Sequence, residues 1–219
     1  KRLALLVREV YDTIIDSCFS LFEEVALRIG IYDYLKFKSS PMQIIFPNGS
    51  KIIFKGLDNP QKLKSINGVS IVWLEECSEC KYEAYKELLG RLRHMEHSNH
   101  IICSTNPVGT DNWTYSHFFK NEEANKTILD DETLYSNRIV KTNNTYYHHS
   151  TCEDNVFLPK SYIDELEQMK DYDYDLYRVA KQGKYGVNGT KVLPQFKEMG
   201  HIEVMNKVNS LPNRLIKYG

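Results

Sequence analysis

Val69-Ser70-Ile71-Val72-Trp73-Leu74-Glu75-Glu76 is the segment from which we predict the fold of this chain. Five of its first six residues are apolar, and two adjacent glutamates follow them directly. So short and continuous an apolar run favours a buried strand of a parallel sheet over an amphipathic helix. In open α/β sheets ligands bind beyond the carboxyl ends of the strands, which is where Glu75 and Glu76 emerge. The segment therefore predicts an α/β fold with a candidate site at these two acids.

Two adjacent carboxylates at the end of a buried strand are costly unless a cation or a reaction uses them. An apolar strand followed by Glu-Glu is typical of the Walker B motif of P-loop ATPases. In that motif the first acid holds Mg²⁺ through its water shell, and the second polarises the attacking water. On this interpretation Glu75 is the metal and cofactor acid and Glu76 the catalytic carboxylate. A surface strand that ends in an acidic turn is the alternative, and the motif alone leaves it open.

Composition narrows the class of protein. The 219 residues, 42% hydrophobic and 26% charged, describe a globular protein of one or two domains. No apolar run approaches about 18 residues, so we expect no membrane span. Five cysteines, an odd number, favour reduced thiols inside the cell over a disulfide framework. Because the net charge is −1, any contact with nucleic acid must be a local patch.

Apolar spacing predicts alternating strands and helices along the rest of the chain. Short apolar runs predict strands at residues 3–7, 42–46, 51–54, 100–105 and 146–151. Helical spacing predicts helices at residues 10–29, 61–66, 82–93, 162–169 and 174–182. The second and third strands flank an Asn-Gly turn and form a predicted hairpin. The succession of strand, helix and strand indicates a parallel sheet with right-handed crossovers.

Polar residues at the predicted sheet edge are further candidates for the site. A neighbouring predicted strand ends in Ser104, Thr105 and Asn106. Hydroxyl and amide groups at this position can hydrogen-bond a phosphate or its attacking water, although a polar turn closed by Pro107 is an equal alternative. Arg8 ends the first predicted strand, where it either reaches an anionic ligand or is simply solvated.

Basic residues outside the predicted edge have two interpretations each. Arg91 and Arg93 face different directions on their helix, so one can be structural while the other reaches a neighbouring subunit's nucleotide. Four lysines form a basic cluster near the predicted site: Lys51, Lys55, Lys62 and Lys64. They are either solvated or part of a patch that faces DNA.

The spacing of Cys77, Cys80, His94 and His97 nearly copies a zinc finger. A helix is predicted between the cysteines and the histidines, where a finger needs a strand and a turn. The histidine spacing is also short by one residue. We therefore expect free, metal-free cysteines.

Taken together, these residues resemble the large terminase subunit of tailed bacteriophages, the motor that packages DNA into proheads. The resemblance is carried by LVREVY at 6–11, GSKIIFKGLD at 49–58, KLKSING at 62–68, VWLEE at 72–76, LLGRLR at 88–93 and STNP at 104–107. Two later stretches, DNVFLP at 154–159 and GKYG at 183–186, look like further landmarks of the family. The match extends over nearly the whole chain.

The resemblance implies a RecA-like P-loop ATPase fold, a mostly parallel sheet flanked by helices, with a small linker subdomain. It implies ATP and Mg²⁺ as cofactors, with Glu75 as the Walker B metal acid and Glu76 as the catalytic carboxylate. It also implies that Ser104, Thr105 and Asn106 form the motif that couples hydrolysis to movement. The implied partners are double-stranded DNA, a portal ring, a small terminase subunit and further copies in a ring, in the cytoplasm of the bacterial host.

The chain also departs from the family pattern. It contains no G-x-x-x-x-G-K phosphate loop, it begins without Met, and the family's nuclease domain would follow Gly219. We therefore expect an incomplete ATPase core at residues 1–152, without its first strand and phosphate loop, and a linker subdomain at 153–219. The intact protein is expected to be an ATPase and a nuclease. A non-catalytic scaffold that binds DNA or the portal is the rival interpretation, and a helicase-like ATPase is a third.

Overall fold

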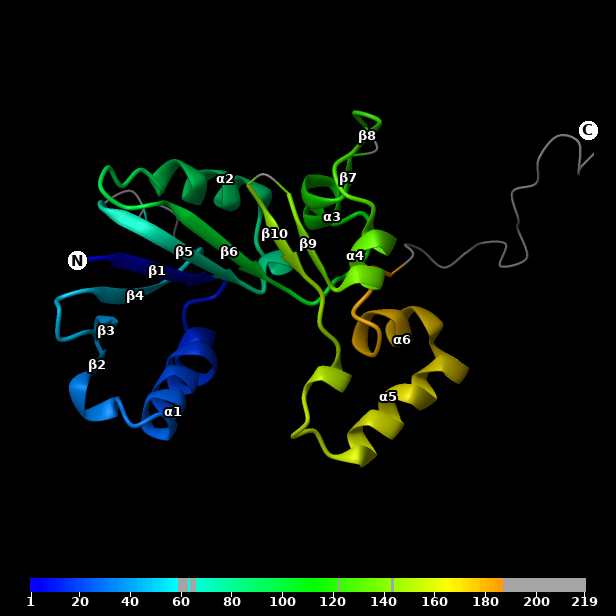
Figure 1. Cartoon of the computed structure of the whole chain (residues 1–219), viewed down its shortest axis with the longest axis horizontal. Coiled ribbons are helices and arrows are strands. Elements are labelled where there is room, and N and C mark those ends of the chain that lie inside the picture. The colour runs from blue at the N-terminus through cyan, green and yellow to red at the C-terminus, as the bar shows by residue number, and fades with distance from the viewer. Residues whose placement is uncertain (59–62, 64–65, 122, 143, 187–219) are drawn as a thin grey trace, which may run out of the picture. The chain divides into compact units, whose positions relative to one another are not determined.

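The computed structural model describes residues 1–58, 63, 66–121, 123–142 and 144–186. Its main feature is a six-stranded sheet of order β2-β3-β4-β1-β5-β6 (Figure 1). The strands are β1 (Leu3–Arg8), β2 (Lys36–Ser39), β3 (Met42–Ile45), β4 (Lys51–Gly56), β5 (Val69–Glu75) and β6 (His100–Ser104). The predicted run that ends in Glu-Glu is β5, and it lies between two other strands of the sheet.

The sheet is parallel in the part that contains β5. β1 pairs in parallel with β4 and β5, and β5 pairs in parallel with β6. β3 is antiparallel to both β2 and β4, which confirms the predicted hairpin. The predicted α/β fold with a mostly parallel central sheet is therefore confirmed. β2 was not predicted, because Lys36-Phe37-Lys38-Ser39 holds a single apolar residue.

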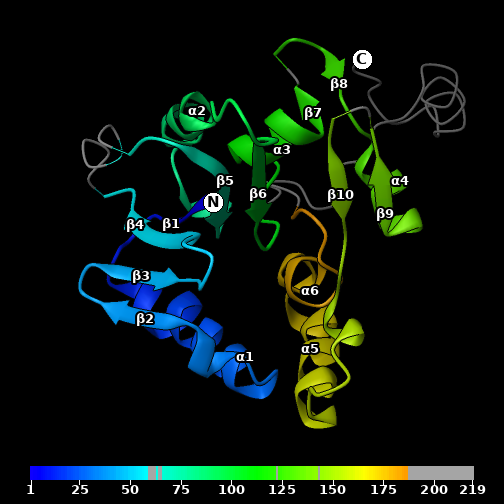
Figure 2. The ribbon, with the colours of Figure 1, turned by 60° about the vertical axis from the view of Figure 1, so that its left-hand side comes forward.

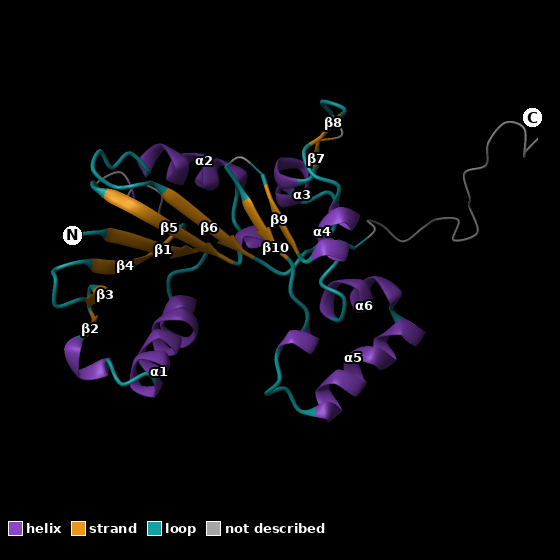
Figure 3. Ribbon diagram, viewed as in Figure 1, coloured by secondary structure: helices purple, strands orange, loops and turns teal. Residues whose placement is uncertain are grey.

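Helices cover both faces of this sheet, which explains the continuous apolar runs (Figures 1 and 3). On one face α2 (Tyr82–Arg91) packs with Val72 and Leu74 of β5, both fully buried. On the other face a π-helical turn, Ile15–Phe19, continues into α1 (Ser20–Arg28) and packs on Leu6 and Phe54. Neighbouring residues of a strand thus enter different clusters, as Leu5 and Leu6 of β1 do. Fully burying each such side chain contributes about 1.5–3 kcal/mol.

The second half of the described chain consists of shorter elements. They are α3 (Trp113–Phe118), β7 (Lys120–Asn121), β8 (Lys126–Thr127), α4 (Asp131–Asn137), β9 (Ile139–Lys141), β10 (Tyr146–His148), α5 (Lys160–Tyr172) and α6 (Tyr174–Ala180). The strand predicted at 146–151 is the shorter β10, and it pairs with β9 instead of the main sheet. The helices predicted at 162–169 and 174–182 are confirmed as α5 and α6.

The loop after β6 is tied to the segment that follows α6. The backbone N–H of Gly186 donates to the carbonyl of Val108 at 2.8 Å, and Gly109 and Gly186 form a parallel β-bridge. Tyr185 is 5% exposed, and its hydroxyl donates to Thr114 Oγ1 at 3.2 Å. These contacts fix the end of the described chain to the exit of β6.

Residues 1–187 group into one compact unit. The predicted boundary between residues 152 and 153 falls inside this unit and remains a prediction. Most of the helical turn predicted at 61–66 lies outside the described residues, as does the chain after residue 186. No helix in the described part is long and apolar enough to cross a membrane.

Candidate functional site at the carboxyl edge of the sheet

The predicted site residues meet at the carboxyl ends of three parallel strands. Arg8 is the last residue of β1, Glu75 the last of β5 and Ser104 the last of β6. Glu75 is the register partner of Ser104. The structure therefore brings together residues that lie far apart in the sequence, because parallel strands end at one edge of the sheet.

Arg8 and Glu75 form an ion pair across this edge. Arg8 Nε lies 2.9 Å from Glu75 Oε2, and each side chain is 20% exposed. Arg8 Nη1 also donates to Ser17 Oγ at 3.3 Å. Arg8 is therefore held at the site and is not a solvated terminal arginine.

Burial is the main reason that the pKa of Glu75 lies above its ordinary value. The nearby carboxylates of Glu76 and Glu79 raise this pKa further, while the guanidinium of Arg8 lowers it. A partly buried acid whose charge is only partly compensated is suited to holding a cation.

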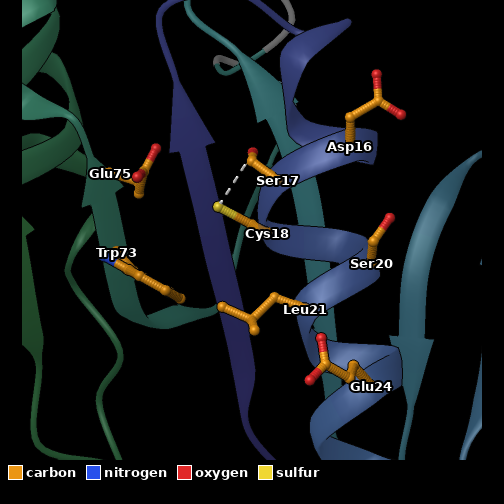
Figure 4. A pocket seen from close by; sticks show the side chains of 8 residues that line it. All are labelled: Asp16, Ser17, Cys18, Ser20, Leu21, Glu24, Trp73 and Glu75. Atoms are coloured by element: carbon orange, nitrogen blue, oxygen red, sulfur yellow. Dashed lines mark hydrogen bonds between the residues drawn. The ribbon is translucent and has the colours of Figure 1, made fainter. Parts of the chain in front are cut away.

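A cavity of about 410 Å³ adjoins Glu75 on the α1 side of the sheet. Figure 4 shows Trp73 and Glu75 of β5 on one side of it and residues of the π-helical turn and α1 on the other. The lining residues are Asp16, Ser17, Cys18, Ser20, Leu21, Glu24, Trp73 and Glu75. Its walls carry three carboxylates and no basic side chain, so the cavity favours cations over bare anions.

Glu76 has an unusual backbone conformation. Its φ of 50° and ψ of 51° lie in the left-handed region, which costs a residue with a side chain about 1–3 kcal/mol. It leads into a 3₁₀ turn at Cys77–Glu79, whose Glu79 N–H donates to the Glu76 carbonyl at 2.9 Å. Within the described residues no hydrogen bond or ion pair holds the Glu76 carboxylate. Glu76 thus combines a strained backbone with a carboxylate that no described residue holds, directly next to Glu75. Backbone strain of this kind is typical of a functional position.

The three polar residues after β6 differ in their surroundings. Trp73 Nε1 donates to Ser104 Oγ at 2.7 Å. Thr105 Oγ1 lies 2.6 Å from Ser78 Oγ and accepts a hydrogen bond from the Ser78 N–H at 3.3 Å. Ser104 and Thr105 thus hold the exit of β6 against β5 and the turn after Glu76. The side chain of Asn106 is exposed and has no hydrogen bond within the described part.

Sequence reasoning missed three residues at this edge. Ser78 joins the turn after Glu76 to Thr105, and Asn112 Nδ2 donates to the Ser78 carbonyl at 3.0 Å. Ser78 lies two residues after Glu76, but nothing in the sequence identifies its partners. Glu9, directly after Arg8, was also not singled out, and its Oε2 is buried without a hydrogen bond in the described structure.

Arg91 is not part of this edge. α2 connects β5 to the parallel β6, so its carboxyl end lies toward the amino ends of the strands. In keeping with this, His97, in the loop after α2, has its Nε2 3.2 Å from the carbonyl of Lys1. The Arg91 side chain is 17% exposed and pairs with Glu87 on the same helix. A role of Arg91 at a neighbouring subunit's nucleotide stays a prediction.

The lysine cluster is only partly described. Lys51 and Lys55 lie on β4, where they pair with Leu3 and Val7 of β1. Lys62 and Lys64 lie outside the described residues. Their contact with DNA also stays a prediction.

The cysteines and histidines do not form a metal centre in the described structure. No three His, Cys, Asp or Glu side chains there group around a common point. Burial raises the pKa of Cys80 to about 12, so in this structure the thiol is protonated at neutral pH. A magnesium ion needs fewer protein ligands than zinc does. It keeps most of its water shell and binds one or two carboxylates together with phosphate oxygens. Glu75 fits that requirement.

Glu75→Gln is expected to change how stability depends on pH. Because the folded state raises the pKa of Glu75, it binds more protons than the unfolded chain between the unfolded-state pKa, about 4.3, and the higher folded-state value. Glu75 therefore lowers stability as pH rises through this window. The free energy of unfolding of Glu75→Gln minus that of the wild type should increase with pH there and level off on both sides.

Urea unfolding of both proteins at a series of pH values measures this difference. Because a guanidinium group remains protonated over this pH range, the loss of the Arg8–Glu75 pair adds only a constant term to the difference. A difference that stays flat or falls through the window would contradict the raised pKa of Glu75.

Comparison with known sequences assigns this chain to a family. Residues 1–184 match the family described as phage terminase large subunit. The chain is 52% identical over 219 residues to the PBSX phage terminase large subunit of Bacillus subtilis (strain 168), covering 100% of the chain and 51% of that relative. It is 27% identical over 195 residues to the terminase large subunit of Bacillus phage SPP1, covering 87% of the chain and 43% of that relative. The chain thus spans about half the length of the curated relatives it matches.

Solved structures agree in fold. The large terminase of a thermophilic bacteriophage superposes with a TM-score of 0.64 at 13% identity, covering 90% of this chain and 44% of that one. The same terminase in complex with ADP gives 0.58 at 14% identity, covering 84% and 40%. The large terminase ATPase domain of Thermus phage P74-26 gives 0.54 at 14% identity, covering 84% and 76%. At these identities the likeness shows the fold alone, and it confirms the predicted ATPase-type α/β architecture.

Proposed function

The chain belongs to the phage terminase large subunit family, and from this premise we propose that it is part of an ATP-driven motor that packages double-stranded DNA into proheads. The observation that carries the proposal is the carboxyl edge of the sheet. There the Arg8–Glu75 pair, the strained Glu76 and the end of β6 lie next to one another. A structural turn has no need of a partly buried acid, only partly compensated by an arginine, beside a strained one.

Each residue has a distinct role in this proposal. Glu75 orients the water shell of Mg²⁺, and Arg8 keeps the Glu75 carboxylate in place. Glu76 accepts a proton from, or polarises, the water that attacks the γ-phosphate. Bound Mg²⁺ supplies neutralisation of the charge that develops on the phosphate oxygens. Ser104 and Thr105 position the exit of β6, and Asn106 is free to sense the nucleotide.

A phosphate-binding segment must come from outside these 219 residues, because they contain no G-x-x-x-x-G-K. β6 is an edge strand of the described sheet, and Ile102 on it is 52% exposed. Unpaired edges with exposed apolar side chains are ready to pair with a further strand. We propose that the phosphate-binding segment of a longer protein lies along this edge.

The remaining features of the family belong to the same proposal. A nuclease activity would lie in a further part of the full-length protein. A portal ring, a small terminase subunit and additional copies of the protein in a ring would be its partners, in the cytoplasm of the bacterial host. Arg91 would act toward the nucleotide of such a neighbouring copy.

The isolated 219-residue chain is expected to hydrolyse ATP at no more than the background rate. The backbone N–H groups and the lysine of a phosphate loop hold the β- and γ-phosphates during transfer, and the chain has no such loop. Phosphate release from the purified chain, with and without Mg²⁺, measures this. Robust Mg²⁺-dependent release would overturn it.

The same assay on the full-length protein, run beside a packaging assay, tests the proposed function. We expect ATP hydrolysis together with ATP-dependent protection of double-stranded DNA inside proheads. Binding of DNA or portal without hydrolysis would favour the non-catalytic scaffold. Separation of DNA strands without packaging would favour a helicase.

A further inference from the structure

One face of the segment from β2 to β4 carries lysines without acids. Strand residues alternate between two faces, and Phe37, Ile44 and Phe54 enter the core on the α1 side. The opposite face therefore carries the residues between them. We call it the lysine face, and its basic residues are Lys36, Lys38, Lys51 and Lys55.

The strand register arranges these lysines in rows. Lys36 pairs with Ile45, which pairs with Lys51, so two ammonium groups share one row across three strands. Lys38 stands two residues along β2, about 6.8 Å from Lys36 at the rise of an antiparallel strand. The lysines thus form a two-dimensional array and not a single line. Such an array can follow an extended polyanion.

The charge on this face is not compensated. The chain as a whole has 28 basic and 29 acidic side chains, yet residues 35–57 contain four lysines and no Asp or Glu. Within the described structure none of the four forms an ion pair. A Cβ at Gly49, in the loop between β3 and β4, would lie 2.9 Å from Lys1 Cε, so a fifth lysine packs beside the array.

The lysine face is accessible at the β2 side. Lys36, Lys38 and Lys51 are exposed. On the same face Ile53 packs against the core cluster that α2 covers. Figure 2 shows β2 and β3 at one side of the sheet, away from α2, which lies near β5. β2 is the edge strand of the described sheet opposite to β6. A partner can therefore approach the array without displacing a described helix.

We propose that the lysine face contacts the phosphate backbone of double-stranded DNA. This inference rests on the proposed packaging function and names a surface for it, adding Lys36 and Lys38 to the lysines that the sequence singled out. A lysine ammonium is a flexible point charge that binds phosphate without the planar fork with which arginine reads bases. Contacts of this kind carry no sequence preference, and they suit DNA that moves past the protein.

Lysines on an edge strand can have a second function, and the test must distinguish it from DNA binding. Lysines on an edge strand also prevent the strand from pairing with another molecule and aggregating. That function predicts a change in association of the protein with itself when the lysines are removed. The DNA contact predicts a change in how DNA affinity depends on salt.

The experiment compares the full-length protein with Lys36→Gln/Lys38→Gln. Binding of a double-stranded DNA of arbitrary sequence is measured by fluorescence anisotropy, without nucleotide, at a series of salt concentrations. Each lysine–phosphate contact adds about 0.9 to the magnitude of the slope of log K against log salt. The double variant should lower that magnitude by about 1.8 while basal ATP hydrolysis without DNA stays at the wild-type rate.

Lys160→Gln/Lys170→Gln is the matched control, since both of these lysines are exposed on α5 and neither forms an ion pair in the described structure. This control should leave the slope unchanged. Equal slopes for the wild type and Lys36→Gln/Lys38→Gln, with or without new aggregation in light scattering, would overturn the inference but not the packaging function. A wild-type protein that does not bind double-stranded DNA would overturn both.

Discussion

Glu76→Gln in the full-length protein is expected to abolish ATP turnover while nucleotide binding stays close to that of the wild type. Glu76 follows β5 directly, beside the Arg8–Glu75 pair, and no described residue holds its carboxylate. A group that orients or deprotonates water acts in the transition state, so its loss lowers kcat more than it weakens binding. General acid–base contributions of this kind are about 10²–10⁴-fold.

Two other substitutions serve as controls for Glu76→Gln. Glu75→Gln should weaken the dependence of hydrolysis on Mg²⁺ concentration, because Glu75 is the acid expected at the water shell of the ion. Glu79→Gln removes an acid from the 3₁₀ turn that follows Glu76 and should leave kcat within a few-fold of the wild type. Steady-state hydrolysis and binding of a fluorescent nucleotide measure the two quantities. Near-normal hydrolysis by Glu76→Gln would show that the two acids are wrongly assigned.

Asn106→Ala is expected to separate hydrolysis from DNA movement. The side chain of Asn106 is exposed, and no hydrogen bond ties it to the described structure. Its removal should therefore change stability little, about ±0.5 kcal/mol. Next to the proposed nucleotide its amide can bond the γ-phosphate, and a loop tied to phosphate occupancy is an element that hydrolysis releases. Packaging should fall much further than ATP hydrolysis.

Asn112→Ala is the matched control for this prediction. The Asn112 side chain accepts a hydrogen bond from the Thr114 N–H at the start of α3 and donates to the Ser78 carbonyl. Loss of a cap of this kind costs about 0.5–2 kcal/mol, so stability should fall for Asn112→Ala and not for Asn106→Ala. ATPase rate and packaging are measured side by side with thermal unfolding. If both activities of Asn106→Ala fell in proportion, or neither fell, the coupling role of Asn106 would have to be abandoned.

The sequence predicted the central sheet and its acidic edge because burial on both faces leaves a plain signal. β5 lies between β1 and β6 with helices on both sides, so nearly every residue from Val69 to Leu74 had to be apolar. Parallel strands then place their last residues together by geometry. β2 gave no such signal, because it is an exposed edge strand with Phe37 as its single apolar residue.

Contacts that depend on the conformation of turns could not be predicted. The bond between Ser78 and Thr105 depends on the conformation of two turns, and neither serine nor threonine at such positions is unusual. The distance of Arg91 from the site, in contrast, already follows from the parallel crossover that the sequence predicts, because α2 runs from the carboxyl ends of the strands to their amino ends. The left-handed conformation of Glu76 has no sequence signal, since residues with a Cβ rarely adopt it.

The bridge between Gly109 and Gly186 connects the end of β6 directly to the end of the described chain. Along the chain, α3, α4, α5 and α6 separate the end of β6 from Gly186. The shorter connection runs from Ser104 through the next four residues to Val108, whose carbonyl accepts a hydrogen bond from the Gly186 N–H. A displacement of the loop at Asn106 therefore reaches Gly186 without passing through the intervening helices. In the proposed motor, a change at the nucleotide would therefore be felt at the end of the described chain through one hydrogen bond.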